Sequence, residues 1–321
     1  MSEGRIFLLM LHVLQGALMY DPVIGDFTYT QEEVVAVPFV QAHQDILNLN
    51  DTFLAQMEKL DQSCGYAALR EKYLTFPASG YQPSKYLNLT SEASCDVFSL
   101  LDNALLEINP CFDIYEINQQ CPLLWDVIGF PTQLVYTPEG ADVYFNRSDV
   151  KAALHAPQYV DWAECSTHPV FVGGNKSAGG YYTGGPEAEG DFSADPIQKV
   201  LPQVIEATNR VLVSNGDFDM IIITNGTLMA IQNMTWNGKL GFDQQPATPI
   251  DIQLPDLQYA AVFAANGADG LDGPQGIMGV QHYERGLMWA ESYLAGHMQP
   301  EFQPRVTYRH LEWLLGRIDQ L

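Results

Sequence analysis

The sequence predicts an α/β fold in which functional side chains gather at one edge of a sheet. Residues 14–21 and 210–214 are apolar runs that end at turn residues, which is typical of buried strands. Apolar residues recur at helical spacing between 41 and 70. Asp219 and His297 each follow a predicted strand within a few residues, so we expect both side chains at the carboxyl edge of the sheet.

The first half of the chain predicts more helix than strand. Residues 34–40 are apolar but contain proline, so we interpret them as a connector rather than a central strand. Residues 95–106 favour a helix, whereas 111–121 look irregular. The apolar positions that predict helix between 41 and 70 are Ile46, Leu47, Phe53, Leu54, Met57 and Leu60.

Helices and strands alternate in the second half of the chain. Residues 148–155 begin with capping residues and continue with helix formers, and 200–207 predict a short helix. Residues 210–214 read as a buried parallel strand, and 288–293 as another strand. A final helix opens at a proline. It is expected to bury one face, made of Tyr308, Leu311, Leu315 and Ile318.

Composition excludes several classes of protein. The chain has 321 residues and a net charge of −24, which argues against nucleic acid as a partner because a phosphate backbone favours a basic surface. Such acidity suits a soluble protein in an acidic or extracellular medium. No run of 18 consecutive apolar residues occurs, so no membrane span is predicted.

Sequons favour the secretory pathway. Six Asn-x-Ser/Thr sequences in one chain are more than accident readily explains. Their acceptors are Asn50, Asn88, Asn146, Asn175, Asn225 and Asn233. Arg5 and the apolar run 6–14 resemble a signal peptide, but His12 inside the run and the weak cleavage context count against that reading.

Four of the five cysteines fall in one stretch, which predicts two disulfides in an oxidising compartment. Of the three possible pairings we choose the nested one, Cys64 with Cys121 and Cys95 with Cys111. Cys165 is left over, and buried free thiols are the alternative for all four clustered residues. Because there is no Cys-x-x-Cys, neither a zinc site nor a redox motif is expected.

Asp219 and His297 suit two members of a Ser-Asp-His hydrolase triad, in the chain order of α/β-hydrolases. A carboxylate on one imidazole nitrogen fixes the tautomer, and the other nitrogen takes the proton of the nucleophile. A turn aspartate and an unrelated loop histidine are the alternative. A metalloenzyme is disfavoured because the chain has no His-Glu-x-x-His, so no metal is predicted.

Several segments resemble the serine carboxypeptidase family of the carboxypeptidase Y type, in particular its fungal secreted members. The most specific are Asn215-Gly216-Asp217-Phe218-Asp219 and Ala295-Gly296-His297-Met298-Gln299-Pro300. The resemblance implies an α/β-hydrolase fold with an inserted helical cap. It divides the chain into a first core strand within 1–33, a cap over 34–147, and the rest of the core over 148–321.

The family removes single residues from the C-termini of peptides through an acyl-enzyme, without a cofactor. The resemblance makes Asp219, rather than Asp217, the catalytic aspartate and His297 the catalytic histidine. Met298 would line the pocket for the leaving residue. The residues that would line the pocket for the preceding side chain are Met220, Ile221 and Ile222, although the isoleucines fit a plain core role equally well. A secreted or vacuolar location is implied.

The family's nucleophile motif is absent, because no Gly-x-Ser-x-Gly occurs in the 321 residues. Ser177 comes nearest by pattern, but it lies in a glycine-rich stretch and follows no clear strand; Ser63 and Ser214 fit no better. We therefore expect an N-terminally truncated member that lacks the first strands and the nucleophile and is inactive by itself. The alternative is a non-catalytic relative that binds peptides or other partners. The sequence predicts no oligomeric state.

Overall fold

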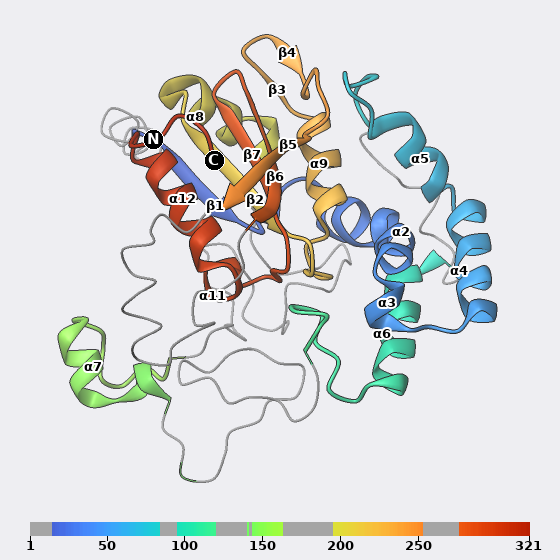
Figure 1. The fold of residues 1–321 in the computed structure, drawn as a ribbon, viewed down its shortest axis with the longest axis horizontal. Helices are drawn as coiled ribbons and strands as arrows, with labels where there is room; N and C mark the ends of the chain where they lie inside the picture. The colour runs from blue at the N-terminus through green and yellow to red at the C-terminus, as the bar shows by residue number, and fades with distance from the viewer. Residues whose placement is uncertain (1–14, 84–94, 120–139, 141–142, 163–194, 253–275) are drawn as a thin grey trace. The chain divides into compact units, whose positions relative to one another are not determined.

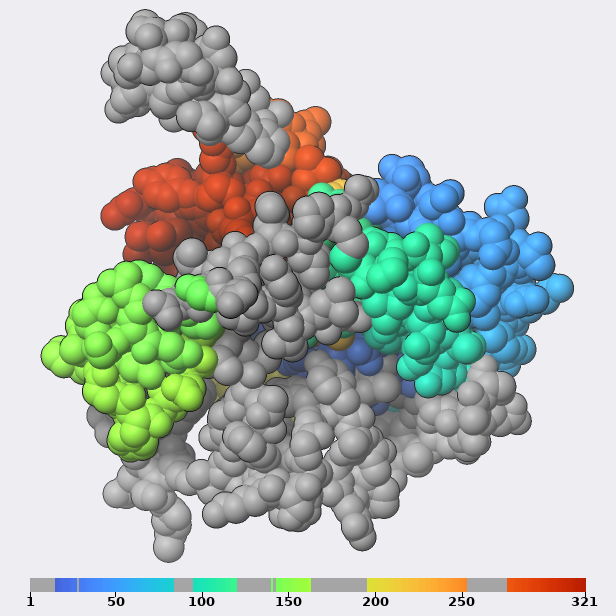
Figure 2. Space-filling view, turned by 90° about the horizontal axis from the view of Figure 1, so that it is seen from below, coloured from blue at the N-terminus to red at the C-terminus, as the bar shows by residue number. Residues whose placement is uncertain are grey.

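The computed structural model describes residues 15–83, 95–119, 140, 143–162, 195–252 and 276–321. The chain divides into two compact units. The first comprises residues 1–108, 114–118 and 195–321, and the second comprises 109–113 and 119–194. In the second unit the short helices η3 (Tyr144–Asn146) and α7 (Ser148–Ala153) are described, in light green in Figure 2. The helix predicted at 148–155 is thus confirmed.

A five-stranded mixed sheet forms the centre of the first unit (Figure 1). Its order is β1-β2-β7-β6-β5. Parallel pairing joins β1 (Ala17–Tyr20), β2 (Val211–Gly216) and β7 (Leu287–Ser292). Antiparallel pairing adds β6 (Gly276–Glu284) and β5 (Thr248–Ile252). The three predicted strands are the three parallel ones, and the α/β class is confirmed.

Helices cover both faces of this sheet because its central strands are apolar on both sides. Val211 and Val213 of β2 pack into one cluster of buried side chains, and Leu212 packs into another. The first cluster is closed by α8 (Val200–Thr208) and α9 (Thr224–Gln232). The second is closed by α12 (Pro304–Leu314), which contacts β1, β2 and β5.

The prediction for the buried face of α12 is wrong. Tyr308, Leu311 and Leu315 are 55%, 43% and 54% exposed. Ile318 lies beyond the end of the helix and packs only partly against the core. The buried stripe holds two polar residues, which made it look less apolar than the exposed one. Its members are Val306, Thr307, His310 and Trp313.

A layer of helices follows β1. The π-helical turn η1 (Phe27–Glu33) runs into α2 (Val34–Ala42), and α3 (Gln44–Leu47) follows. Three more helices are α4 (Asp51–Ser63), α5 (Tyr66–Tyr73) and α6 (Val97–Ile108). Figure 2 shows α6 in teal beside the blue helices, and α6 contacts both α2 and α4. Among the described residues no helix combines the length and apolarity needed to cross a bilayer.

The predicted connector at 34–40 is in fact the buried helix α2, which contains Pro38. A proline in a helix leaves the carbonyl four residues earlier without its backbone donor. Here that carbonyl belongs to Val34, and the guanidinium of Arg70 donates to it. Arg70 also pairs with Asp61 through two bonds of 2.6 Å. A side chain from α5 thus replaces the missing bond, which the local sequence does not reveal.

The nested disulfide pairing is also wrong. Cys64, at the end of α4, is bonded to Cys95, two residues before α6. Cys111 is disulfide-bonded as well, whereas Cys121 and Cys165 lie outside the described residues. Helix packing explains the pairing, because α4 and α6 contact each other and bring the two cysteines together.

The side chain of Glu33, which is distant in sequence, caps the N-terminus of α6. Its carboxylate Oε2 accepts hydrogen bonds from the backbone N–H groups of Val97 at 2.8 Å and Phe98 at 3.1 Å. These N–H groups have no partner inside the helix, so the Glu33 carboxyl oxygen satisfies two of them. Hydrogen bonds thus join α6 to η1, the first helical turn after β1.

Candidate functional site

The structure brings Asp219 and His297 together. Asp219 follows β2, His297 follows β7, and these parallel neighbours end at the same edge of the sheet (Figure 1). Nδ1 of His297 lies 2.8 Å from Oδ2 of Asp219. The side chain of Asp219 is fully buried, and that of His297 is 28% exposed. The pair therefore has one face in the protein and one toward solvent.

The turn after β2 holds the Asp219 carboxylate in place. Its Oδ1 accepts hydrogen bonds from the backbone N–H groups of Ile221 at 2.8 Å and Ile222 at 3.1 Å. These bonds orient the carboxyl group and leave Oδ2 for the imidazole. Asp217 faces elsewhere, since its Oδ1 accepts from the N–H of Ala295. Of the two aspartates, Asp219 is the one whose carboxyl oxygen lies 2.8 Å from the imidazole.

Asp217, the neighbouring aspartate, lies in an environment that shifts its pKa. Burial, together with the charge of Glu291, raises the pKa of Asp217 to about 7. Its carboxyl group accepts hydrogen bonds from the backbone N–H groups of Leu294 and Ala295, in the segment between β7 and His297.

A segment at 114–118 supports the same edge. The N–H of His297 donates to the carbonyl of Tyr115 at 2.7 Å, and the N–H of Met220 donates to that of Ile114 at 2.9 Å. The ring centroids of Tyr115 and His297 are 5.4 Å apart, and the N–H of Gly296 donates to Glu116. Sequence reasoning missed these residues because 111–121 has no periodicity that signals a role.

The predicted pocket residues lie next to the pair. Met298 is half-buried directly after His297. Met220, Ile221 and Ile222 are 0%, 6% and 2% exposed. Such burial fits the core alternative for the isoleucines at least as well as a pocket. Their clearest contribution comes from the backbone, because the N–H groups of Ile221 and Ile222 donate to the Asp219 carboxyl group.

A second buried carboxylate, Asp21, lies beside the pair and was not predicted. It follows β1 and is 4% exposed. Ligand atoms of Asp21, Asp219 and His297 all lie within 4.8 Å of one another. Burial, followed by the charge of Asp219, raises the pKa of Asp21 well above its ordinary value. Such a trio has ligand atoms for a cation, but its carboxyl oxygens already accept hydrogen bonds: those of Asp21 from Gly216 and Gln299, and those of Asp219 from its own turn and His297.

The glycosylation acceptors are placed unevenly. Asn50 and Asn225 are exposed, Asn146 and Asn233 are half-buried, and Asn88 and Asn175 lie outside the described residues. Asn50 caps α4 by accepting from the N–H of Phe53. Exposure at Asn50 and Asn225 is compatible with modification, and glycosylation of all six stays a prediction.

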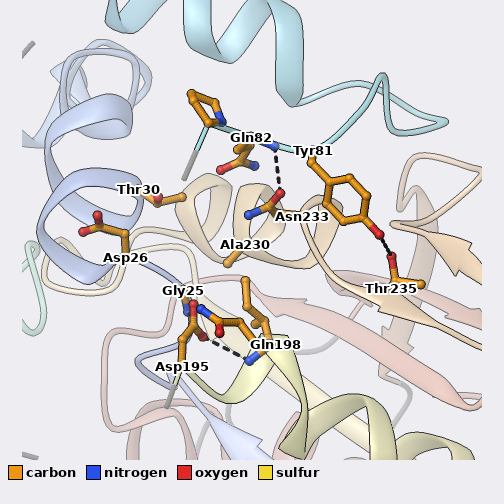
Figure 3. A pocket seen from close by; sticks show the side chains of 12 residues that line it. Gly25, Asp26, Thr30, Tyr81, Gln82, Asp195, Gln198, Ala230, Asn233 and Thr235 are labelled. Carbon is orange, nitrogen blue, oxygen red and sulfur yellow. Dashed lines mark hydrogen bonds between the residues drawn. The ribbon is translucent and has the colours of Figure 1, made fainter. Parts of the chain in front are cut away.

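A polar cavity of about 480 Å³ lies near the end of α9 (Figure 3). Asn233 Oδ1 accepts from the N–H of Gln82 at 2.8 Å on its wall, and Tyr81 Oη lies 2.7 Å from Thr235 Oγ1. Its lining includes neither Asp219 nor His297, so this cavity is separate from the pair.

Comparison with known proteins identifies the family. The serine carboxypeptidase family matches residues 11–317. The chain belongs to the serine carboxypeptidase family. It is 60% identical over 308 residues to serine-type carboxypeptidase F of Aspergillus niger, covering 96% of this chain and 56% of that protein. A carboxypeptidase Y homolog of Arthroderma benhamiae is 32% identical over 310 residues, covering 96% and 54%.

The serine carboxypeptidase fold is also found among solved structures. The chain matches Kex1(delta)p, a prohormone-processing carboxypeptidase from Saccharomyces cerevisiae, with a TM-score of 0.57 and 18% identity. The match covers 98% of this chain and 59% of that one. The chain thus spans about half the length of the curated relatives it matches, at 53–56% for the three first ones.

Proposed function

We propose that this chain supplies the Asp219–His297 pair of a serine carboxypeptidase, which removes single residues from the C-termini of peptides through an acyl-enzyme. The contact of 2.8 Å between His297 Nδ1 and Asp219 Oδ2 carries the proposal. It fixes the tautomer in which Nε2 takes the proton of a serine hydroxyl, and the buried carboxylate stabilises the imidazolium that forms. No cofactor enters this reaction.

The nucleophile is the part of the reaction that the 321 residues do not supply. No Gly-x-Ser-x-Gly is present among them. We therefore propose that the 321-residue chain alone hydrolyses neither peptides nor esters, since a triad without its serine loses several orders of magnitude in turnover. Turnover by the recombinant chain on a blocked dipeptide, above that of its His297→Ala variant, would contradict this.

Adding a part of a relative that this chain does not match tests the pair itself. The preceding part of serine-type carboxypeptidase F, 60% identical over the shared 308 residues, is fused ahead of this chain. The fusion should hydrolyse blocked dipeptides, and His297→Ala should lower kcat by about 10⁴-fold or more. His155→Asn is the matched control, because His155 is exposed with φ of 57°, a conformation that asparagine tolerates. Near-normal kcat in His297→Ala would remove His297 from the mechanism.

A second candidate is a non-catalytic relative that binds peptide C-termini, favoured by the absence of the serine motif from the 321 residues. Two results together would support this candidate: the chain alone binds a fluorescent peptide, and the fusion with carboxypeptidase F shows no hydrolysis. The acidic composition and the sequons support a secreted or vacuolar glycoprotein in either case. Glycopeptide mass spectrometry after secretion from a fungal host tests the location and the modification together.

A further inference from the structure

We propose that Asp21 and Gln299 are positioning residues that clamp together the two segments carrying Asp219 and His297. The inference rests on the proposed function for its catalytic meaning. The clamp itself is a property of this chain.

Asp21 reaches both catalytic segments with one carboxyl group. Its Oδ1 accepts from the N–H of Gly216 at 2.9 Å, three residues before Asp219. Its Oδ2 accepts from Nε2 of Gln299 at 2.6 Å, two residues after His297. The two bonds bridge sequence separations of 195 and 278 residues. The end of β1 therefore joins the ends of β2 and β7 at the point where the pair sits.

The backbone of Asp21 is arranged for this task. Its N–H donates to the carbonyl of Ser214 at 2.8 Å, and its φ is 42°. Non-glycine residues seldom adopt this region, and such strain concentrates at functional sites. The positive φ turns the chain after β1, and Asp21 as a whole residue is 4% exposed.

Gln299 fastens the other side of the clamp. Its Oε1 accepts from Ser214 Oγ at 2.7 Å and Ser292 Oγ at 2.8 Å, on β2 and β7. All three side chains belong to fully buried residues. Both hydroxyls donate to one amide oxygen, and the amide nitrogen faces a carboxylate, so the orientation of the amide is fixed. The loop that carries His297 is thereby tied to three strands.

Charge and hydrogen bonding can be separated at Asp21. Among the residues that the structure describes, Asp21, Asp219 and His297 form a cluster of titratable groups, and Glu116 accepts from the N–H of Gly296. Asp21→Asn removes the ionisable carboxyl group, and a 180° turn of the Gln299 amide restores the bonds, because serine hydroxyls also accept. Gln299→Ala removes the clamp itself. The first variant should therefore keep the geometry of the pair and the second should lose it.

The test observes His297 by NMR in the ¹⁵N-histidine-labelled chain. The Nδ1–H proton that bonds Asp219 should resonate downfield of ordinary imidazole protons. Gln299→Ala should move it upfield and speed its exchange with water by at least about tenfold, the worth of a hydrogen bond to a charged group. Asp21→Asn should retain the downfield signal. An unchanged signal and exchange rate in Gln299→Ala would overturn the clamp.

Gln281→Ala is the matched control. Gln281 is a buried glutamine of the same sheet, on β6, and its amide binds the N–H and carbonyl of Leu321 at 3.1 and 2.7 Å. This variant should lower the melting temperature as much as Gln299→Ala does without changing the His297 signal. If both variants change the His297 signal equally, the effect of Gln299→Ala reflects a general loss of stability and not a clamp on the pair.

Two milder variants keep the proposal testable if Gln299→Ala fails to fold. Ser214→Ala and Ser292→Ala each remove one bond to Gln299 Oε1. Proton exchange at His297 should rise in each and rise further in the double variant, and no change in the double variant would refute the proposal. In the active fusion, Gln299→Ala should lower kcat more than KM changes. If the fusion proves inactive, the function fails while the spectra still decide the clamp.

Discussion

Two glycines allow backbone segments to approach closely beside Asp219 and His297. A Cβ added to Gly216 would lie 2.2 Å from the carbonyl oxygen of Ala295, and one added to Gly296 would lie 1.9 Å from that of Tyr115. Real Cβ atoms do not approach backbone oxygens so closely, so any side chain at either position displaces the backbone. The short distance between Asp219 and His297 depends on these two positions.

Gly296→Ala should therefore uncouple the pair. We expect a lower melting temperature and loss of the downfield His297 proton, because the backbone next to His297 must move away from Tyr115. Gly238→Ala is the control: it has open space and a φ of 76°, so its cost is limited to about 1–2 kcal/mol of backbone strain. Equal effects of the two variants in melting and NMR experiments would show that the close approach of Gly296 to Tyr115 does not matter for the pair.

The sequence predicts some residues of this site and not others for a physical reason. Asp219 and His297 each sit in a short motif after a strand, so local spacing marks them. Asp21 and Gln299 act through bonds that span 195 and 278 positions, and no local pattern encodes such a contact. Tyr115 contributes a backbone carbonyl, which any residue type would supply.

Secondary-structure elements show the same division. The parallel strands were predictable because they are continuous apolar runs. The antiparallel strands were not predictable in this way. In β5, which contains Pro249, buried residues alternate with exposed ones, and β6 is interrupted by Gly279. Helix α2 was misread because its proline is compensated by Arg70, which is distant in sequence.

The Cys64–Cys95 disulfide should stabilise the helical layer. It closes a loop with a sequence separation of 31, for which chain entropy predicts about 3–4 kcal/mol. Cys64→Ser, Cys95→Ser and the double variant should all lose the same amount, because each breaks the same bond. Thermal melting measures the loss, and a non-reduced peptide digest identifies the pairing. A double variant clearly less stable than both single ones would argue against a shared bond.

At the scale of the whole molecule, buried acids set the response to pH. Burial is the main reason that the pKa values of Glu32 and Glu33 rise from 4.5 to about 8, and that of Glu291 to about 7. The folded chain therefore binds more protons than the unfolded chain between these values. Stability must then fall as pH rises. The stabilisation is fully present below the unfolded pKa and is lost as pH rises through the folded one.

We expect the melting temperature to decrease from pH 4.5 to pH 8, the window given by Glu33. Glu33→Gln should flatten this slope, because the amide oxygen still accepts from the N-terminus of α6 but no longer ionises. Glu107→Gln is the control. It changes an exposed residue of α6 and should leave the slope of melting temperature against pH unchanged. A melting temperature that rises with pH in the unmodified chain would contradict the burial argument.

The sheet also predicts how the chain behaves alone. Among the described residues β1 pairs only with β2, so its other edge is open. Open edges of apolar strands promote association, and each unpaired buried backbone group costs roughly 1–3 kcal/mol. We expect the isolated chain to associate or to melt at low temperature. A monomer by size exclusion with a cooperative transition above about 50 °C, within the mesophile range, would show that the edge is tolerated.

The pairing of β1 with β2 has a consequence for synthesis on the ribosome. Ala17 pairs with Val211, so the strand must wait for 211 − 17 = 194 further residues before its partner exists. At about 5–20 residues per second, that wait is roughly 10–40 s. During it, the apolar side chains of β1 are available to other nascent chains. Slowing or arresting translation between these strands should therefore increase the dependence of this protein on chaperones that bind nascent chains.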